Sequence, residues 1–308
     1  MMLQPQILID KFVESTDPRS VQYNNIAKLR LSDAQLREYN FPRKSTTPGL
    51  AYLPSAHVAL DENRRKCDQC GNEFNLTEYD QESVNQCRYH PNRKTDQNNA
   101  YLCCKKLYGS FGCTTNYHVT AQIAYNDLAT FVSAPTCDIN YVPTQADIFS
   151  LDCEMCYTVA GSEIISITVV DIGGKVVYDT YVKPTHRIVN YNTAYSGIDA
   201  KTLENVTCTL SDVQGKLCSM FHSKTILIGH SLESDFKALK LVHDMVVDTS
   251  VLFIQHRGRR SPVKRRLKTV VLDYLHRHIQ LDGTGHSSLE DAQACIDLVL
   301  LKIQQQTR

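Results

Sequence analysis

The chain has 308 residues, 42% of them apolar and 21% charged, and its 33 Lys and Arg residues balance its 33 Asp and Glu residues. This length accommodates about two domains, and the composition excludes a wholly disordered chain. The balanced charge does not indicate a nucleic-acid or membrane partner, so only local charge is informative. No apolar run approaches the ~20 residues of a membrane span, and Asp10 and Lys11 interrupt the N-terminus before a signal-peptide core. We therefore expect an intracellular protein with no membrane partner.

In chain order, the first region is a polar N-terminal extension with one predicted short helix, in the stretch LSDAQLREYNFP. Ser32 is the predicted N-cap, Gln35 its capping-box partner, and Pro42 the stop. The predicted division of the chain is an extension over 1–60, a cysteine- and histidine-rich module over 61–120, a linker over 121–145 and a main domain over 146–308.

The second region carries six of the twelve cysteines, which in a reducing compartment indicate metal ligation or buried thiols rather than disulfides. Four motifs, CDQC, CRYH, CC and GCTTNYH, supply the candidate ligands Cys67, Cys70, Cys87, His90, Cys103, Cys104, Cys113 and His118. Zinc takes four such ligands, so these eight predict two structural Zn²⁺ ions, with one ion and spare thiols as the alternative. Closed sites of this kind hold a fold together, so we expect a structural or substrate-gripping role and no chemistry.

The main domain has the pattern of an α/β fold. Three strands are predicted first, in IFSLDCEMCY, EIISITVVDI and KVVYDTYVK, with a hairpin turn at Gly173 and Gly174. TILIGH and VVDTSVLF are predicted as buried strands, ESDFKALKLV as a helix, and two further helices at about 265–279 and 288–303. These elements predict a mixed five-stranded sheet flanked by helices.

Two carboxylates interrupt the first predicted strand. Side chains two residues apart in a strand share a face, so Asp152 and Glu154 point one way while Leu151, Cys153 and Met155 point the other. Burying two like charges without a positive partner costs several kcal/mol. The strand therefore predicts a cation beside Asp152 and Glu154.

Two further acids are predicted to converge on the same sheet edge: Asp235 in GHSLESDFKAL and Asp291 in GHSSLEDA, with His286 five residues before Asp291. Mg²⁺ and Mn²⁺ prefer oxygen ligands, and carboxylates from distant segments hold two such ions ~3.5–4 Å apart for phosphoryl transfer. A histidine beside the reacting water takes its proton near neutral pH. The cofactors predicted here are two Mg²⁺ or Mn²⁺ ions.

Each of these residues also has a simpler interpretation. An Asp-x-Glu triplet arises roughly once by chance in a chain of this length. Asp235 and Asp291 would each suit the first turn of a helix, and His286 would suit a surface loop. Together, these interpretations leave the strand carboxylates without a positive partner, so the metal site explains more of the sequence.

The stretches LDCEM, TILIGHSLESDFKAL, VVDTSVLF and GHSSLEDAQACIDLVL resemble the exonuclease motifs of the DEDDh superfamily, in the branch of RNA exonuclease 1 homologue and GOR antigen. VVYDTYVKP, YNTAYSGI and LRLSDAQLREYNFP extend the resemblance to most of the chain. It implies a ribonuclease H-like fold, with residues 146–308 as the DEDDh exonuclease domain. It also implies that Asp152 bridges two metals, that Glu154 and Asp291 complete one site, and that Asp235 supports the other largely through water.

The same resemblance implies that His286 is the general base and that Met155 lies beside the 3′-terminal nucleotide. The implied function is a 3′–5′ exoribonuclease that releases nucleoside 5′-monophosphates from single-stranded RNA 3′ ends. The alternatives are the same chemistry on single-stranded DNA and an inert nucleic-acid-binding adaptor that uses the zinc module. In that module, CRYHP, the double cysteine and the final GC to His118 partly resemble the CHORD zinc-binding module, which spaces its first cysteines more widely and has an additional histidine.

One local charge cluster stands out. RGRRSPVKRRLK, residues 257–268, holds seven basic residues and no acid, and is predicted as an exposed loop leading into a helix. An RNA contact, a nuclear import signal and a solvated loop all fit it. The resemblance implies a nuclear family, so we expect a nuclear location, with the nucleolus as an option.

Overall fold

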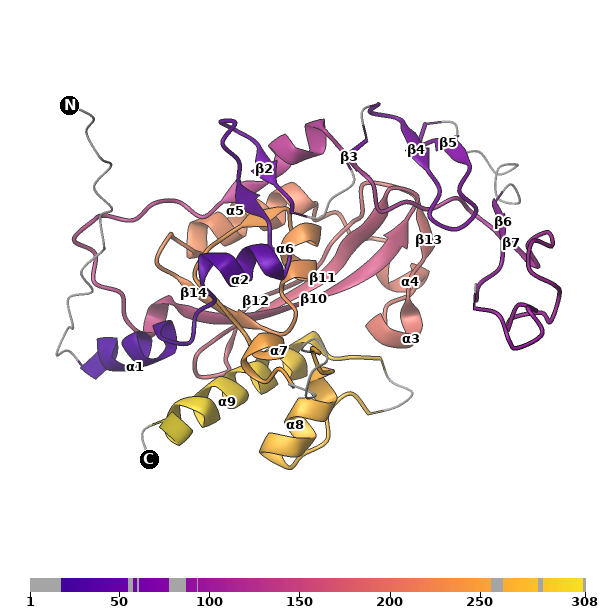
Figure 1. Ribbon diagram of the computed structural model, residues 1–308. Coiled ribbons are helices and arrows are strands. Elements are labelled where there is room, and N and C mark those ends of the chain that lie inside the picture. Colours follow the sequence, from indigo (N-terminus) through magenta and orange to yellow (C-terminus); the bar gives the residue numbers. More distant parts are fainter. Residues whose placement is uncertain are drawn as a thin grey trace, which may run out of the picture.

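A computed structural model describes residues 18–54, 58–59, 61–77, 87–92, 94–255, 263–281 and 285–306. Its centre is a mixed sheet with the strand order β12-β11-β10-β14-β16 (Figure 1). The strands are β10 (Ile148–Thr158), β11 (Gly161–Asp171), β12 (Val176–Tyr181), β14 (Ile226–Gly229) and β16 (Val246–Asp248). The first three run antiparallel, and β14 and β16 join them in parallel. The predicted α/β class is confirmed, but the sheet has six strands and not five, because β13 (Ile188–Asn190) pairs with the end of β10.

Helices cover both faces of this sheet, as its apolar strands require. β14 buries all four of its residues, and β11 buries seven consecutive residues. One hydrophobic cluster joins the strands to α1 (Pro18–Ala27), α8 (Leu267–Leu275) and α9 (Ser288–Gln306). A second cluster joins the strands to α2 (Asp33–Glu38), α5 (Leu210–Met220) and α6 (Glu233–Ala238). The sheet is therefore the middle layer of three.

The N-terminal extension contributes to both clusters. The predicted capping box is confirmed, since Ser32 accepts from the Gln35 backbone N–H and the Gln35 side chain accepts from the Ser32 N–H. Phe41, just after α2, is fully buried in one cluster. Helix α1, which was not predicted, buries Tyr23 and Ile26 in the other. These residues hold the extension against the sheet.

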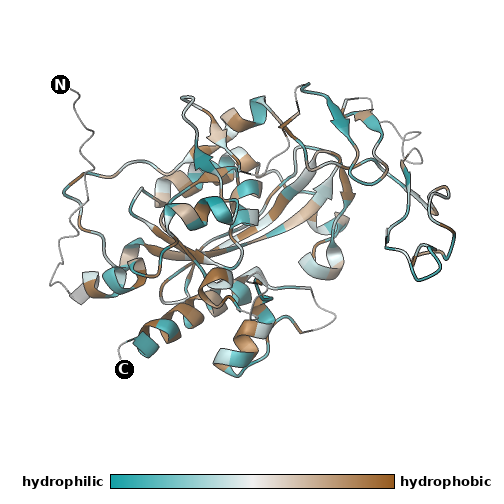
Figure 2. Cartoon of the chain, viewed as in Figure 1, coloured by the Kyte–Doolittle hydropathy of each residue, from teal (hydrophilic) through white to brown (hydrophobic). Residues whose placement is uncertain are grey.

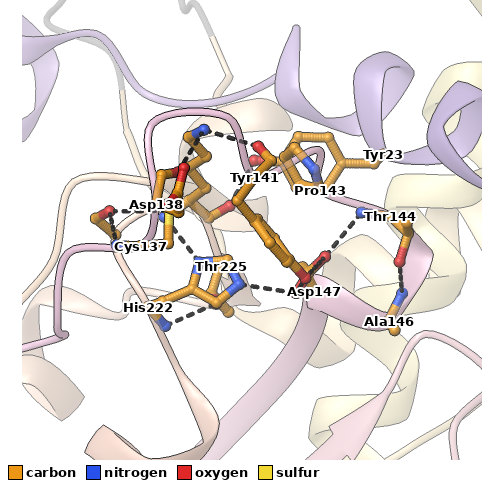
Figure 3. Close-up of polar contacts among 12 residues, drawn as sticks. Tyr23, Cys137, Asp138, Tyr141, Pro143, Thr144, Ala146, Asp147, His222 and Thr225 are labelled. Carbon is orange, nitrogen blue, oxygen red and sulfur yellow. Dashed lines mark hydrogen bonds and ion pairs between the residues drawn. The ribbon is translucent and has the colours of Figure 1, made fainter. Parts of the chain in front are cut away.

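A polar network fixes the chain just before β10 (Figure 3). Asp147, at the end of the 3-10 helix η3 (Gln145–Asp147), accepts hydrogen bonds from the Tyr141 hydroxyl at 2.8 Å and the Thr144 N–H at 2.7 Å. The His222 Nε2 atom lies 2.8 Å from the same carboxylate, and the Tyr23 hydroxyl donates to the Lys224 carbonyl. Residues before β10 are thereby joined to α1 and to the loop that leads into β14.

Two predicted elements change type partway along. In VVDTSVLF only β16 is a strand; α7 (Thr249–Leu252) follows because the Asp248 carboxylate caps it through the Ser250 N–H. In ESDFKALKLV, α6 gives way to β15 (Leu241–Val242) after Lys240, which has a positive φ of 48°. β15 pairs with β9 (Val132–Ser133), which follows the 3-10 helix η2 (Asn126–Thr130). Among the described helices, none combines the length and apolar character needed to span a bilayer.

The cysteine-rich module consists of short strand pairs. They are β4 (Arg64–Lys66) with β5 (Glu73–Asn75), β6 (Cys87–Tyr89) with β7 (Thr114–Asn116), and β3 (Val58–Ala59) with β8 (Ile123–Ala124). Figure 2 shows the central sheet in brown and white and β4 in teal. The module contacts the sheet where β13 pairs with the end of β10. There the guanidinium of Arg187, just before β13, donates to the Tyr117 hydroxyl at 3.1 Å and lies over the Tyr117 ring. Other short elements are β1 (Arg43–Lys44), β2 (Ala51–Tyr52), α3 (Thr193–Ser196) and α4 (Ala200–Leu203).

Candidate active site and candidate metal centres

The acidic residues gather where one edge of β10 is open. β14 pairs with β10 as far as Ser150, and β13 begins to pair only at Tyr157, so no other described strand covers the edge between them. There the Cys153 backbone N–H donates to the Asp235 carboxylate at 3.0 Å. The Ser150 hydroxyl donates to the Ala292 carbonyl at 2.8 Å, which holds the start of α9 against β10. The gap in the sheet therefore brings α6 and α9 to β10.

The alternation predicted for β10 is present. Leu151, Cys153 and Met155 pack in the cluster that contains α2, α5 and α6. Asp152 and Glu154 occupy the other set of positions, and Glu154 is only 8% exposed. A register shift between Glu154 and Met155 marks a β-bulge, a feature that re-aims side chains beside functional sites.

The four carboxylates make one electrostatic group. Burial raises the pKa of Asp152 well above its usual range, and the charges of Asp235, Asp291 and Glu154 raise it further. Burial, and then Asp291 and Asp235, raise the pKa of Glu154 to about 8. Burial raises the pKa of Asp235 to about 7 and that of Asp291 to about 6. No described Lys, Arg or His forms an ion pair with any of the four. The group thus favours a bound cation, which would remove this repulsion.

Hydrogen bonding separates a structural carboxylate from one that is available to a ligand. Asp248, 1% exposed, accepts from the N–H groups of Ser231, Leu232 and Ser250, so its two oxygens are used by the backbone. Asp291, 4% exposed, accepts from the Gln280 side chain through Oδ2 at 2.6 Å, but its Oδ1 atom is buried without a partner. A buried oxygen without a donor is what a hard cation would satisfy.

Sequence reasoning missed Gln280. Its side-chain amide bonds Asp291, and its backbone N–H donates to Glu290 at 3.0 Å, so one residue contacts two neighbouring acids of α9. Gln280 has a positive φ of 53°, an uncommon conformation for a side chain of this type. No motif around this position indicated the contact, because the residue lies 11 positions from Asp291 in a loop.

His286 lies in the loop just before α9. Its backbone N–H donates to the Tyr195 carbonyl, and its ring packs edge-on against the Tyr195 ring at 5.8 Å. Gly285 allows the loop before α9 to lie this close to the segment after Tyr195, since a Cβ at Gly285 would lie 2.5 Å from the Gly197 backbone. Burial lowers the pKa of His286, and the Lys268 ammonium lowers it further. The imidazole is therefore neutral at pH 7 and able to accept a proton.

The eight predicted zinc ligands form two separate groups of four. One contains Cys67, Cys70, Cys87 and His118, and the other contains His90, Cys103, Cys104 and Cys113. Within each group the ligand atoms all lie within 4.8 Å of one another. Among the described residues, no three carboxylates have oxygen atoms this close together. This arrangement indicates a pairing, which the sequence left open. The groups are nested along the chain, since all four residues of the second group lie between Cys87 and His118 of the first, and the β6–β7 pair connects them.

The spacing within each group matches a tetrahedral centre. Ideal zinc sites with bonds of about 2.3 Å to sulfur and 2.0 Å to nitrogen have ligand atoms about 3.5–3.8 Å apart. The Sγ atoms of Cys67 and Cys87 are 3.6 Å apart, and Cys70 Sγ lies 3.4 Å from His118 Nδ1. In the second group, Cys103 and Cys104 each lie 3.5 Å from His90 Nδ1. Both donor sets, three thiols and one imidazole, therefore suit zinc.

The basic stretch 257–268 is described only from residue 263 onwards. Two of its described cations are used within the domain: Lys264 pairs with Glu233 at 2.7 Å, and Arg265 pairs with Asp273. Residues 257–262 lie outside the described residues, so their predicted role as an RNA contact or import signal stays a prediction.

A family profile described as Exonuclease matches residues 149–299, which include all five predicted catalytic residues. The chain is 40% identical over 301 residues to RNA exonuclease 1 homolog of Homo sapiens, covering 93% of this chain and 24% of that protein. It is 38% identical over 300 residues to Exonuclease GOR of Pan troglodytes, covering 94% of this chain and 43% of that protein. It is 32% identical over 303 residues to RNA exonuclease 3 of Candida albicans, covering 94% of this chain and 72% of that protein. The chain therefore spans less than half of the first two relatives.

Proposed function

Because this chain belongs to the exonuclease family, we propose that it is a metal-dependent 3′–5′ exoribonuclease that releases nucleoside 5′-monophosphates from single-stranded RNA. The observation that carries the proposal is the group of Asp152, Glu154, Asp235 and Asp291, whose burial and mutual repulsion favour a divalent cation. RNA is favoured over DNA because relatives that align with nearly the whole chain are named RNA exonucleases.

The four carboxylates are the proposed ligands of two Mg²⁺ or Mn²⁺ ions. When bound, such ions stabilise the negative charge that develops on the scissile phosphate and its leaving oxygen. Asp152 and Glu154 supply oxygens from β10, and Asp291 supplies the buried Oδ1 atom that has no donor. The Cys153 N–H and the Gln280 amide fix one oxygen each of Asp235 and Asp291, so the carboxylates are oriented before the substrate arrives.

His286 is the proposed general base. Its lowered pKa keeps the ring neutral near pH 7, so it accepts a proton from the attacking water. Met155, beside the register shift between β10 and β11, is the proposed contact of the 3′-terminal nucleotide. We also propose a nuclear location, which tagged protein with and without Arg257→Gln/Arg259→Gln/Arg260→Gln would test.

The Cys/His groups are proposed to hold two structural Zn²⁺ ions, one in each. The support is the donor chemistry and the 3.4–3.6 Å spacings of their ligand atoms. Neither group has an open position for a substrate, because four protein ligands complete a tetrahedron. Their role is to hold the module together.

A single gel assay tests the proposal. Labelled single-stranded RNA and DNA of one sequence are incubated with the protein, with and without Mg²⁺, and products are resolved in time. We expect stepwise shortening of RNA from its 3′ end, only with metal, and 5′-monophosphates as products. Preferential degradation of DNA would show that the enzyme is a DNA exonuclease. Binding without any cleavage would favour an adaptor, and internal cuts would exclude exonuclease action.

A further inference from the structure

The loop between Cys104 and Cys113 presents an apolar surface to solvent. Leu107, Tyr108 and Phe111 are 67%, 65% and 85% exposed, so their side chains contribute little to any core. Clustered exposed aromatic side chains of this kind usually mark a binding site. The proposed structural role of the zinc module does not account for them.

This surface is held in place by the second Cys/His group. The His90 ring stacks on the Tyr101 ring at 3.7 Å, and Tyr101 contacts the Tyr108 ring at 5.6 Å. The Tyr108 N–H donates to the Asn99 carbonyl at 2.8 Å. An aromatic ring presented on a fixed backbone loses little entropy when a flat partner stacks on it.

The sequence around this loop is rich in basic residues. Residues 87–118 contain five basic residues and one acid; these are Arg88, Arg93, Lys94, Lys105 and Lys106, and Asp96. Lys105 lies 3.6 Å from Asp96 and stays 67% exposed, so solvent screens this pair and leaves the ammonium accessible. Local positive charge beside exposed rings is typical of surfaces that bind single-stranded nucleic acid.

The module lies beyond the end of β10 at which β13 pairs (Figure 1). Thr158 ends β10 six residues after Asp152, which at ~3.3 Å per residue is about 20 Å along the strand. A stacked strand advances about 3.4 Å per nucleotide, so about six or more nucleotides are needed to reach from the site to the module. A dinucleotide cannot do so.

We propose that an aromatic-basic face, formed by Lys105, Lys106, Leu107, Tyr108 and Phe111, binds the upstream part of the single-stranded RNA substrate. Bases stack on the two rings, and the lysines contact phosphates. A protein partner is disfavoured by the charge, because five cations to one acid suit a polyanion. This inference rests on the proposed function for its substrate, but the binding itself requires no catalysis.

The test compares Tyr108→Ala/Phe111→Ala with wild-type protein and with Tyr181→Ala, a control that removes a 46% exposed tyrosine on β12. Equilibrium binding to a non-hydrolysable phosphorothioate RNA 12-mer is measured by fluorescence anisotropy, and zinc content is checked in every variant. We expect the double variant to bind the 12-mer about ten- to a hundred-fold more weakly, with unchanged zinc content and unchanged turnover of a dinucleotide.

Charge is tested separately with Lys105→Gln/Lys106→Gln. Each lost phosphate contact reduces the slope of log affinity against log salt by about 0.7, so this variant should show a slope about 1.4 less steep. Wild-type affinity for the 12-mer in the ring variant, or an equal loss on the dinucleotide, would overturn the proposal. Reduced self-association with unchanged RNA affinity would overturn it in favour of a protein contact. Loss of 12-mer affinity in a protein that cleaves nothing would instead leave the face standing and reject the exonuclease assignment.

Discussion

The central sheet and the cysteine-rich module hold their polar groups in opposite ways. The sheet has two apolar clusters, and its four carboxylates are placed at an open edge where burial disfavours their charge. In the module, candidate ligands make up much of the buried interior, since Cys67, Cys87, His90 and His118 are all less than 9% exposed. The fold of the sheet is therefore expected to survive the loss of one carboxylate, whereas the module depends on each ligand.

The largest effect is expected from the carboxylates. Asp152→Asn and Asp291→Asn should each lower activity about 10³-fold or more while the protein stays folded, because several kcal/mol of transition-state stabilisation come from the metals. Calorimetric titration with Mn²⁺ should show lower stoichiometry or affinity. Asp171→Asn, at the last residue of β11, is the matched control; its side-chain oxygen can still accept from the Gly173 and Lys175 N–H groups, so it should behave as wild type. Full activity of either site variant would refute the site.

His286→Ala should lower turnover about 10²- to 10⁴-fold with substrate binding nearly unchanged, because a base acts mainly in the transition state. The wild-type rate should rise with pH through an ionisation below the ordinary imidazole value of about 6.5, since burial and Lys268 lower the pKa of His286. Lys268→Met should move that limb to higher pH. If the limb persists unchanged in His286→Ala, another group is the base.

Gln280 offers a finer test of the sheet region. Gln280→Ala should weaken Mn²⁺ binding about ten- to a hundred-fold, as expected when a residue that orients a metal ligand is lost. Gln280→Glu also removes the amide donor to Asp291, but its added negative charge attracts the cation, so its loss of Mn²⁺ affinity should be smaller. Thermal stability close to wild type, together with lower Mn²⁺ affinity, would separate positioning from a purely structural role; unchanged affinity would exclude positioning.

Much of the sheet region could be predicted because its signals are local. The alternation around Asp152 and the capping box at Ser32 depend only on neighbouring residues, and both are present. The Gln280 to Asp291 contact could not be predicted, since a loop conformation with positive φ creates it. The grouping of the eight zinc ligands was equally unpredictable, because ligand spacing along the chain does not say which distant strands pair.

The module should respond to ligand loss by losing structure. Cys67→Ser and Cys113→Ser, one in each group, should lower the melting temperature and reduce zinc from about two ions per chain, because structural zinc binding is folding energy. Cys208→Ser, a free thiol outside both groups, is the control. Elemental analysis of protein purified without added metal measures the ions directly. Wild-type protein with no metal, or with iron, would contradict the assignment.

The smallest expected effect concerns how the sheet responds to pH without its cations. The pKa values of Glu154, Asp235 and Asp291 are raised to about 8, 7 and 6, so the folded protein binds protons there more tightly than the unfolded chain. Raised carboxylate pKa values contribute stability that is complete below about pH 4 and is lost as the pH rises through 6 to 8. Protein dialysed free of Mg²⁺ and Mn²⁺ should therefore lose stability over that window.

Buried histidines change the stability in the opposite direction as the pH rises. Their effect must therefore be the same in the two proteins whose pH dependence is compared. Burial lowers the pKa of His230 and His243, and their contribution to stability is lost as the pH falls. Glu154→Gln keeps both histidines and removes one raised carboxylate, so its melting temperature should fall less than that of wild type between pH 6 and 8. Mn²⁺ should raise the melting temperature of wild type more at pH 8 than at pH 5.5, because it binds the deprotonated carboxylates. Parallel melting curves for both proteins across this window, with no added stabilisation by Mn²⁺, would show that the carboxylates are already neutralised by the protein and need no cation.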